Sequence, residues 1–140
     1  MEDFSSLVNL RDLWYANNLI RHIKPVLVGC TSLRTLELGA NRIKEIQHLE
    51  YLTGLTSLWL GKNRIRTIEN LSTLVNLRKL DLQSNRLTKL EGLEALVNLQ
   101  ELYLAHNRIT RLEGLNTLVR ISKPLFGYKS CFLYIFKSHL

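Results

Sequence analysis

Five side chains with capacity for binding or catalysis recur at intervals of 22 or 23 residues. They are aromatic or acidic: Trp14, Glu37, Trp59, Asp81 and Tyr103. Two carboxylates at a suitable separation can act as general acid and base in glycoside hydrolysis. Exposed Trp and Tyr are instead the residue types most enriched at protein-binding hot spots. Which chemistry applies depends on the elements that carry these residues.

Those elements follow from an internal repeat centred on asparagine. Asn41, Asn63, Asn85 and Asn107 are each 22 residues apart, and Asn18 lies 23 residues before Asn41. Around each Asn, apolar residues recur at fixed offsets; for Asn63 they are Leu55, Leu58, Leu60, Ile65, Ile68, Leu71 and Leu74. The L-x-x-L-x-L-x-x-N pattern predicts an α/β leucine-rich-repeat solenoid. We expect short parallel strands on its concave face and helical or 3-10 turns on its convex face.

The asparagine has a structural explanation. Where each strand ends and the chain turns, backbone N–H and C=O groups lose their partners in the sheet. An Asn amide both donates and accepts hydrogen bonds, so a stack of Asn side chains can satisfy those groups in successive coils. We therefore interpret these asparagines as structural and not catalytic.

The five recurring aromatic and acidic residues occupy the middle of each L-x-L strand, where side chains point away from the core. We call them the concave file, and strand spacing makes it roughly 20 Å long. Glu37 and Asp81 are then about 10 Å apart. An open sheet offers no water-excluding pocket for catalysis, and Trp59 separates the two acids. The histidines lack metal-binding spacing and no nucleotide-binding motif occurs, so we expect no enzyme, cofactor or metal.

A second regularity follows the asparagines. Arg42, Arg64, Arg86 and Arg108 form a column, and Glu69, Glu91 and Glu113 form another close by. One interpretation is a basic stripe for phosphate or RNA. The other, which we favour, is a solvated rim on which opposite charges alternate.

Charge divides the chain into two parts. The formal net charge is +7, of which the segment 119–140 carries +4 from Arg120, Lys123, Lys129 and Lys137 and no acid. We expect a solenoid of about five coils over 1–118, starting without an obvious cap, and a basic apolar non-repeat tail over 119–140. The tail either packs on the last coil or stays loose. We do not expect the chain to bind membranes or nucleic acid, or to form a homo-oligomer.

Longer phrases carry a family resemblance. "LGKNRIRTIENLSTL", "LQSNRLTKLEGL" and "LVNLQELYLAHNRI" resemble the leucine-rich-repeat regulatory subunit of protein phosphatase 1 (the regulatory subunit 7 family), over about residues 4–118. Members have roughly a dozen repeats, more than occur here. The resemblance implies a non-catalytic subunit in the nucleus and cytoplasm that binds the phosphatase catalytic subunit. By this resemblance Glu37 and Trp59 occupy contact positions, and Trp14, two coils before Trp59, occupies a strand position where an aromatic residue is also expected. Asp81 and Tyr103 share the concave file with them.

A second hypothesis remains open, in which the chain is a different adaptor of the same repeat class, such as a ciliary or cytoskeletal one. It would bind a protein other than the phosphatase through the same concave face. A third hypothesis is that the chain resembles spliceosomal leucine-rich-repeat proteins and binds RNA through the arginine column. The absence of an apolar leader at the start, and two cysteines without pair spacing, lead us to expect an intracellular protein with reduced thiols.

Overall fold

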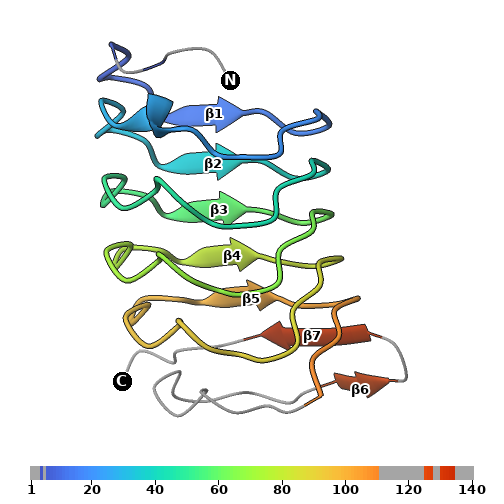
Figure 1. Ribbon diagram of the computed structural model, residues 1–140. Coiled ribbons are helices and arrows are strands. Elements are labelled where there is room, and N and C mark those ends of the chain that lie inside the picture. The colour runs from blue at the N-terminus through green and yellow to red at the C-terminus, as the bar shows by residue number, and fades with distance from the viewer. Residues whose placement is uncertain (1–3, 5, 111–124, 128–129, 135–140) are drawn as a thin grey trace.

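The molecule is a solenoid with one short strand per repeat. The computed structural model describes residues 4, 6–110, 125–127 and 130–134. Five strands come from the repeats: β1 (Asp12–Trp14), β2 (Thr35–Glu37), β3 (Ser57–Trp59), β4 (Lys79–Asp81) and β5 (Glu101–Tyr103). They lie side by side in chain order in one parallel sheet (Figure 1). The predicted solenoid with parallel strands is confirmed.

The repeat length sets the register of the sheet. Leu36, Leu58, Leu80 and Leu102 are Cα partners in successive strands, and Leu13 of β1 pairs with Leu36. The four later leucines are fully or almost fully buried. Because side chains alternate along a strand, the residues on either side of each leucine face away from the core.

The return side of the solenoid is made of single turns. The described residues contain one 3-10 helix, η1 (Pro25–Leu27), which begins at a proline. Elsewhere leucines three residues apart are linked by backbone bonds: the N–H of Leu52 donates to Leu49 O (3.0 Å), and that of Leu55 to Leu52 O (2.9 Å). Such bonds between residues i and i−3 have the geometry of a 3-10 turn. The expected helical or 3-10 turns are thus one short helix and isolated turns.

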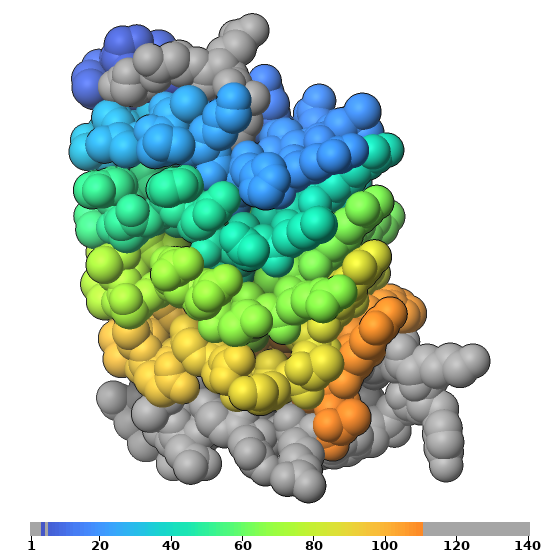
Figure 2. Space-filling view, viewed as in Figure 1, coloured from blue at the N-terminus to red at the C-terminus, as the bar shows by residue number. Residues whose placement is uncertain are grey.

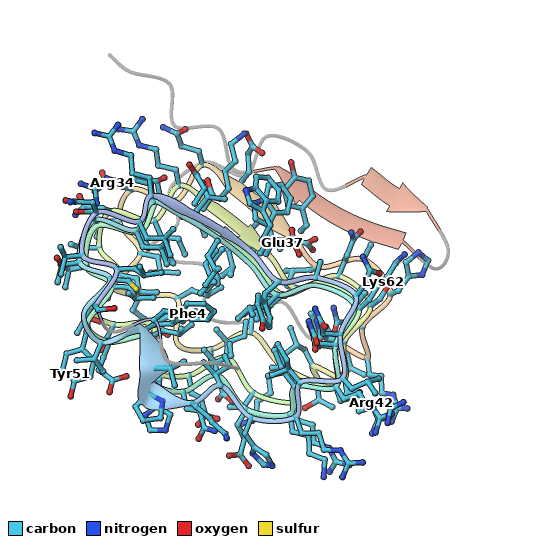
Figure 3. The ribbon with its side chains drawn as sticks, turned by 90° about the horizontal axis from the view of Figure 1, so that it is seen from above. Phe4, Arg34, Glu37, Arg42, Tyr51 and Lys62 are labelled. Atoms are coloured by element: carbon cyan, nitrogen blue, oxygen red, sulfur yellow. The ribbon has the colours of Figure 1, made fainter. Side chains whose placement is uncertain are left out.

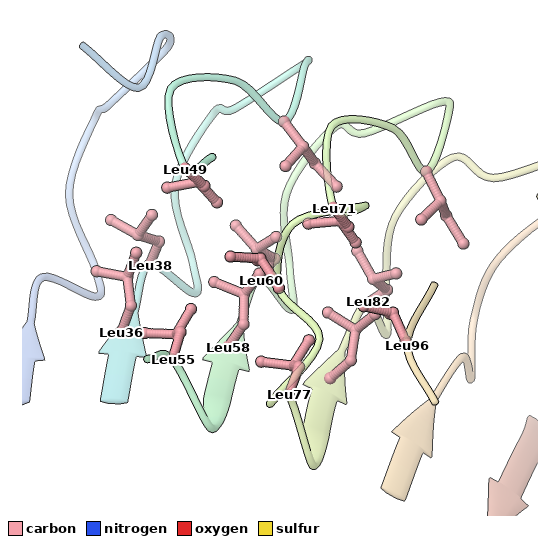
Figure 4. Packing of buried hydrophobic residues seen from close by; sticks show 14 of the residues in the cluster. Leu36, Leu38, Leu49, Leu55, Leu58, Leu60, Leu71, Leu77, Leu82 and Leu96 are labelled. Atoms are coloured by element: carbon pink, nitrogen blue, oxygen red, sulfur yellow. The ribbon is translucent and has the colours of Figure 1, made fainter. Parts of the chain in front are cut away.

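Leucines and isoleucines from all the coils form one continuous core (Figure 4). Figure 2 shows the coils as successive bands, so each inner coil is covered by a coil on either side. At the N-terminal end, the ring of Phe4 packs against this core and meets Tyr15 edge-on, with ring centroids 6.0 Å apart. Phe4 N–H donates to Val26 O at 3.1 Å.

The asparagine ladder that the sequence predicts is present. Asn63 Oδ1 accepts a hydrogen bond from Ile43 N–H of the preceding coil (2.9 Å). Asn63 Nδ2 donates to Leu38 O of that coil (3.0 Å) and to Leu60 O of its own (3.1 Å). Asn41 and Asn85 make the same set of contacts, and all three are buried. Asn18 is exposed and bonds only to nearby carbonyls.

Beyond the repeats the chain reverses direction. The strand β7 (Ser130–Tyr134) pairs antiparallel with β5, and β6 (Leu125–Gly127) pairs antiparallel with β7. Both lie at the β5 edge of the sheet (Figure 1). The expected boundary at residue 118, and Glu113, lie outside the described residues.

Candidate protein-binding face

The concave file exists as one line of residues across the sheet. Trp14 pairs with Glu37, Glu37 with Trp59, Trp59 with Asp81, and Asp81 with Tyr103 as Cα partners in adjacent strands. Figure 3, which looks along the stack of coils, shows Glu37 on the side of the sheet away from the core. The structure therefore brings all five predicted site residues together.

Exposure along this file is uneven. Trp14 is 69% exposed, and Glu37, Trp59 and Tyr103 are partly exposed. Asp81 is only 6% exposed. The expectation that all five side chains face solvent is therefore wrong for Asp81, which cannot be a freely accessible contact residue.

Asp81 is enclosed because the aromatic rings on either side of it meet. Trp59 on β3 and Tyr103 on β5 are stacked, with ring centroids 6.0 Å apart and an interplanar angle of 26°. The strands that carry them are separated by β4, so their Cα atoms are about 10 Å apart. The rings must lean toward each other over β4, which carries Asp81. Stacked aromatic pairs of this kind are favourable, and this one forms a rigid apolar platform.

The two carboxylates fold back onto their own backbone. Gly39 N–H donates to Glu37 Oε1 (2.6 Å), and Gln83 N–H donates to Asp81 Oδ1 (2.8 Å). Gln83 Nε2 donates to Asp81 Oδ2 at 3.2 Å. A Cβ at Gly61 would lie 2.7 Å from Asp81 Oδ2. The small residue in the neighbouring coil therefore makes room for this carboxylate.

Burial raises the pKa of both acids above the ordinary range. For Glu37, burial is the largest cause, the bond from Gly39 N–H opposes it, and the negative charge of Asp81 adds to the rise in pKa. For Asp81, burial again dominates and the bonds from Gln83 oppose it. Glu37 thus presents a partly desolvated carboxylate between two tryptophans, an environment that favours a cationic partner group.

A polar network borders the aromatic platform. Tyr103 Oη donates to Glu101 Oε2 (2.6 Å), and Lys79 Nζ lies 3.0 Å from Glu101 Oε1. The Tyr103 hydroxyl, followed by Lys79, lowers the pKa of Glu101. Lys79 and Glu101 are Cα partners in adjacent strands, two residues before Asp81 and Tyr103, and the sequence analysis did not predict this network. Their opposite charges at the same repeat position of adjacent coils were the available signal.

The arrangement suits recognition better than catalysis. Asp81 lies under an aromatic stack, so the Glu37–Asp81 pair does not frame an open site where a substrate bond could lie between two carboxyl groups. Among the residues that the structure describes, no cluster of three or more His, Cys, Asp or Glu could hold a metal ion. In the same residues, no helix has the length and apolar character needed to cross a membrane.

Asn76 and Asn98 have a structural role that the sequence analysis did not predict. Asn76 Nδ2 donates to Thr53 O (3.0 Å) and Asn98 Nδ2 to Val75 O (2.9 Å), in each case bridging to the preceding coil. These bonds form a second ladder, at the entrance to the strands. The repeated phrase "LVNL" was the sequence signal for it.

Comparison with known families agrees with this geometry. The family model described as Leucine Rich repeats (2 copies) matches residues 31–74, 53–95 and 75–117. The chain belongs to the leucine-rich-repeat family. Proteins of this family generally serve as protein-binding scaffolds. A comparison with curated proteins found no match.

Solved leucine-rich-repeat structures share the fold. An internalin from Listeria monocytogenes superposes with a TM-score of 0.75 and 32% identity, covering 88% of this chain and 36% of that one. Internalin C2 from the same bacterium superposes with a TM-score of 0.66 and 33% identity, covering 71% of this chain and 44% of that one. The chain thus spans less than half the length of these relatives. A third structure is the ectodomain of the Arabidopsis thaliana receptor kinase GASSHO1/SCHENGEN3, solved in complex with CASPARIAN STRIP INTEGRITY FACTOR 2. It superposes with a TM-score of 0.65 and 28% identity, covering 76% of this chain and 14% of that one.

Proposed function

We propose that this leucine-rich-repeat protein is a non-catalytic regulatory subunit that binds the catalytic subunit of protein phosphatase 1 through its concave face. The observation that carries the proposal is the concave file, in which exposed Trp14, partly desolvated Glu37 and the Trp59–Tyr103 stack lie in one line. The choice of phosphatase is supported by the resemblance of the longer repeat phrases to its regulatory subunit.

The concave face has the composition of a binding hot spot. Aromatic side chains held on a rigid sheet lose little conformational entropy when they contact a partner. Trp59 is braced by Tyr103, and Glu37 by Gly39 N–H, so both are fixed before binding. A partner that places a basic side chain beside Glu37 would gain an ion pair in a partly desolvated setting.

Binding can be tested with the purified phosphatase catalytic subunit immobilised on a biosensor. Trp59→Ala is expected to weaken binding by about 2 kcal/mol, or roughly 30-fold, because truncation of a central aromatic anchor typically has this effect. Glu37→Arg should weaken it further by placing a positive charge opposite the basic group of the partner.

Tyr51→Ala is a matched control. Tyr51 is 51% exposed and projects from the opposite side of the solenoid from Glu37 (Figure 3), so its removal should leave binding unchanged. If the wild-type chain does not bind, the assignment to the phosphatase is wrong. If Trp59→Ala and Glu37→Arg both retain full affinity, the concave face is not the binding surface.

A further inference from the structure

A column of arginines runs along an edge of the solenoid away from the concave file. Arg42, Arg64, Arg86 and Arg108 each follow a ladder asparagine. Figure 3 shows Arg42 on the edge of the solenoid where the chain turns from the sheet, well separated from Glu37. The column is therefore a second surface, independent of the face assigned to the phosphatase.

The backbone holds these arginines at a constant interval. The N–H of Arg64 donates to Ile43 O of the preceding coil, and the N–H of Arg86 donates to Ile65 O, both at 2.8 Å. Arg42 and Arg108 make the equivalent bonds, to Ile20 O and Leu87 O. One arginine thus occurs per coil, with backbones about 4.8 Å apart along the stack. The backbone of the column is evenly spaced and spans about 15 Å.

No arginine of the column forms an ion pair within the part of the chain that the structure describes. The two ion pairs among the described residues are Lys79–Glu101 and Lys89–Glu91, and neither includes an arginine of the column. The expected alternation of opposite charges thus exists in sequence, but Glu91 pairs with Lys89 instead of Arg86. The guanidinium groups of the column are left to interact with water or with a ligand.

Beside the column lies a hollow of about 800 Å³. Its charged lining residues are Lys44, Arg64, Arg66, Arg86, Glu45 and Glu69, and Gln47, Thr67 and Asn70 add polar groups. Four cations against two acids leave the hollow with a formal charge of +2. The guanidinium fork matches a carboxylate with two parallel hydrogen bonds.

We propose that this hollow and the arginine column bind an extended acidic segment of a partner protein, in which Glu or Asp alternates with neutral polar residues. In an extended chain, alternate side chains on one face are about 6.6 Å apart. About three carboxylates can therefore face the 15 Å column. The amide of Gln47 can in addition hydrogen-bond the peptide backbone of the segment.

Single-stranded RNA fits the same surface less well. Proteins that bind single strands combine a basic groove with aromatic side chains on which bases stack, and no aromatic residue lines this hollow. Glu45 and Glu69 would also repel a strand that carries a charge on every unit. A peptide can place neutral residues opposite these two acids.

Fluorescence polarisation tests the proposal on the 140-residue chain. The probe is a fluorescein-labelled peptide of about eight residues in which Glu and Ser alternate, a length that exceeds the 15 Å span of the column. We expect it to bind, with an affinity that falls as salt is added. The Gln–Ser peptide of equal length should not bind. The double variant Arg64→Gln/Arg86→Gln should weaken binding of the acidic peptide about tenfold, because two charge-assisted contacts are lost.

The matched control is Arg11→Gln/Arg78→Gln. It removes the same charge from other exposed sites, which lie outside the hollow. Binding of the acidic peptide should be unchanged in this variant. Equal weakening by both double variants would show attraction to net charge alone and overturn the proposal. Tighter binding of oligouridine or phosphatidylserine vesicles than of the acidic peptide would overturn it as well. None of these outcomes depends on binding to the phosphatase.

Discussion

At the scale of single residues, the concave file and its border contain two kinds of acid. Asp81 is enclosed, and burial raises its pKa. Glu101 lies beside the concave file, and the Tyr103 hydroxyl and Lys79 lower its pKa. The charge on Asp81 therefore opposes folding, whereas the charge on Glu101 supports it. Asp81 is tolerated because Gln83 supplies two hydrogen bonds to its carboxylate.

Replacing Asp81 by asparagine should stabilise the protein at neutral pH. Because the pKa of Asp81 is raised in the folded state, the folded protein binds the proton more tightly, and stability falls as pH rises through the folded pKa. The substituted side chain carries no charge at any pH, and its amide oxygen can still accept from Gln83 N–H. The melting temperature of Asp81→Asn should exceed that of wild type at neutral pH, and the gap should close below pH 3.8, the ordinary pKa of Asp.

Glu101→Gln is the matched control with the opposite sign. A lowered pKa stabilises the folded state above pH 4.5, the ordinary value for Glu, and this stabilisation is lost as pH falls through the folded pKa. The variant should therefore melt below wild type at neutral pH and converge with it in acid. A destabilised Asp81→Asn protein at neutral pH would contradict the assigned environment. The pKa of Glu37 should also fall in Asp81→Asn, because one cause of its rise is removed.

At the scale of elements, each coil is defined by a short strand and a turn, and the asparagine ladder links the two. The residue before each repeat asparagine has a positive φ in every coil: Asn17 (57°), Ala40 (51°), Lys62 (54°), Ser84 (54°) and His106 (57°). This left-handed conformation is unfavourable for residues other than glycine. The turn accepts it because the adjoining asparagine bonds the surrounding backbone groups.

Asn63→Leu should therefore lower the free energy of unfolding substantially. Leucine has the same number of side-chain heavy atoms, but it leaves Ile43 N–H buried without a partner and removes one of the two hydrogen bonds that Leu38 O accepts, the other coming from Asn41 Nδ2. A buried group without a partner costs about 1–3 kcal/mol, so we expect a loss of about 2 kcal/mol. Urea denaturation measures it. Asn18→Leu is the control, since exposed Asn18 bonds only local carbonyls and the change should have little effect. Equal losses in the two variants would contradict a role for cross-coil bonds.

At the scale of the whole molecule, each coil is stabilised by its packing against neighbouring coils. In a solenoid each repeat contacts only the repeats beside it, so a defect at one end stays near that end. Phe4 covers the first coil, where Leu13, Tyr15 and Ile20 are only partly buried. The central leucines have neighbours on both sides and are fully buried.

Phe4→Ala should loosen the first coil selectively. Hydrogen exchange is expected to speed up at Tyr15 N–H and Asn17 N–H, which bond to the second coil, and to change little at Leu60 N–H and Lys62 N–H. Leu58→Ala is the comparison, because a cavity in the centre costs about 2–5 kcal/mol and should accelerate exchange through all the coils. A uniform acceleration in Phe4→Ala would show that the solenoid opens as one unit.

The repeat spacing alone predicted the sheet, its register, the inward leucines and the first asparagine ladder. A constant interval of 22 residues leaves one way to stack identical turns over a shared core. Asn63 has a side-chain amide that can both accept a hydrogen bond from a backbone N–H and donate one to a backbone carbonyl of the turn. The concave file followed from the same register. These features depend on local periodicity, which the chain carries directly.

The tertiary structure decided what happens between side chains of different coils. Trp59 and Tyr103 are 44 residues apart, and no local pattern indicates that their rings meet over β4 and enclose Asp81. The pairing of Lys79 with Glu101 across adjacent coils, for which the sequence offered only opposite charges at one repeat position, was also decided by the fold. Glu91 instead pairs locally with Lys89, two residues before it, and Arg86 is left out of that ion pair. Ring orientation and ion-pair choice depend on distances across the stack, because each is a competition between neighbours that only the folded chain brings together.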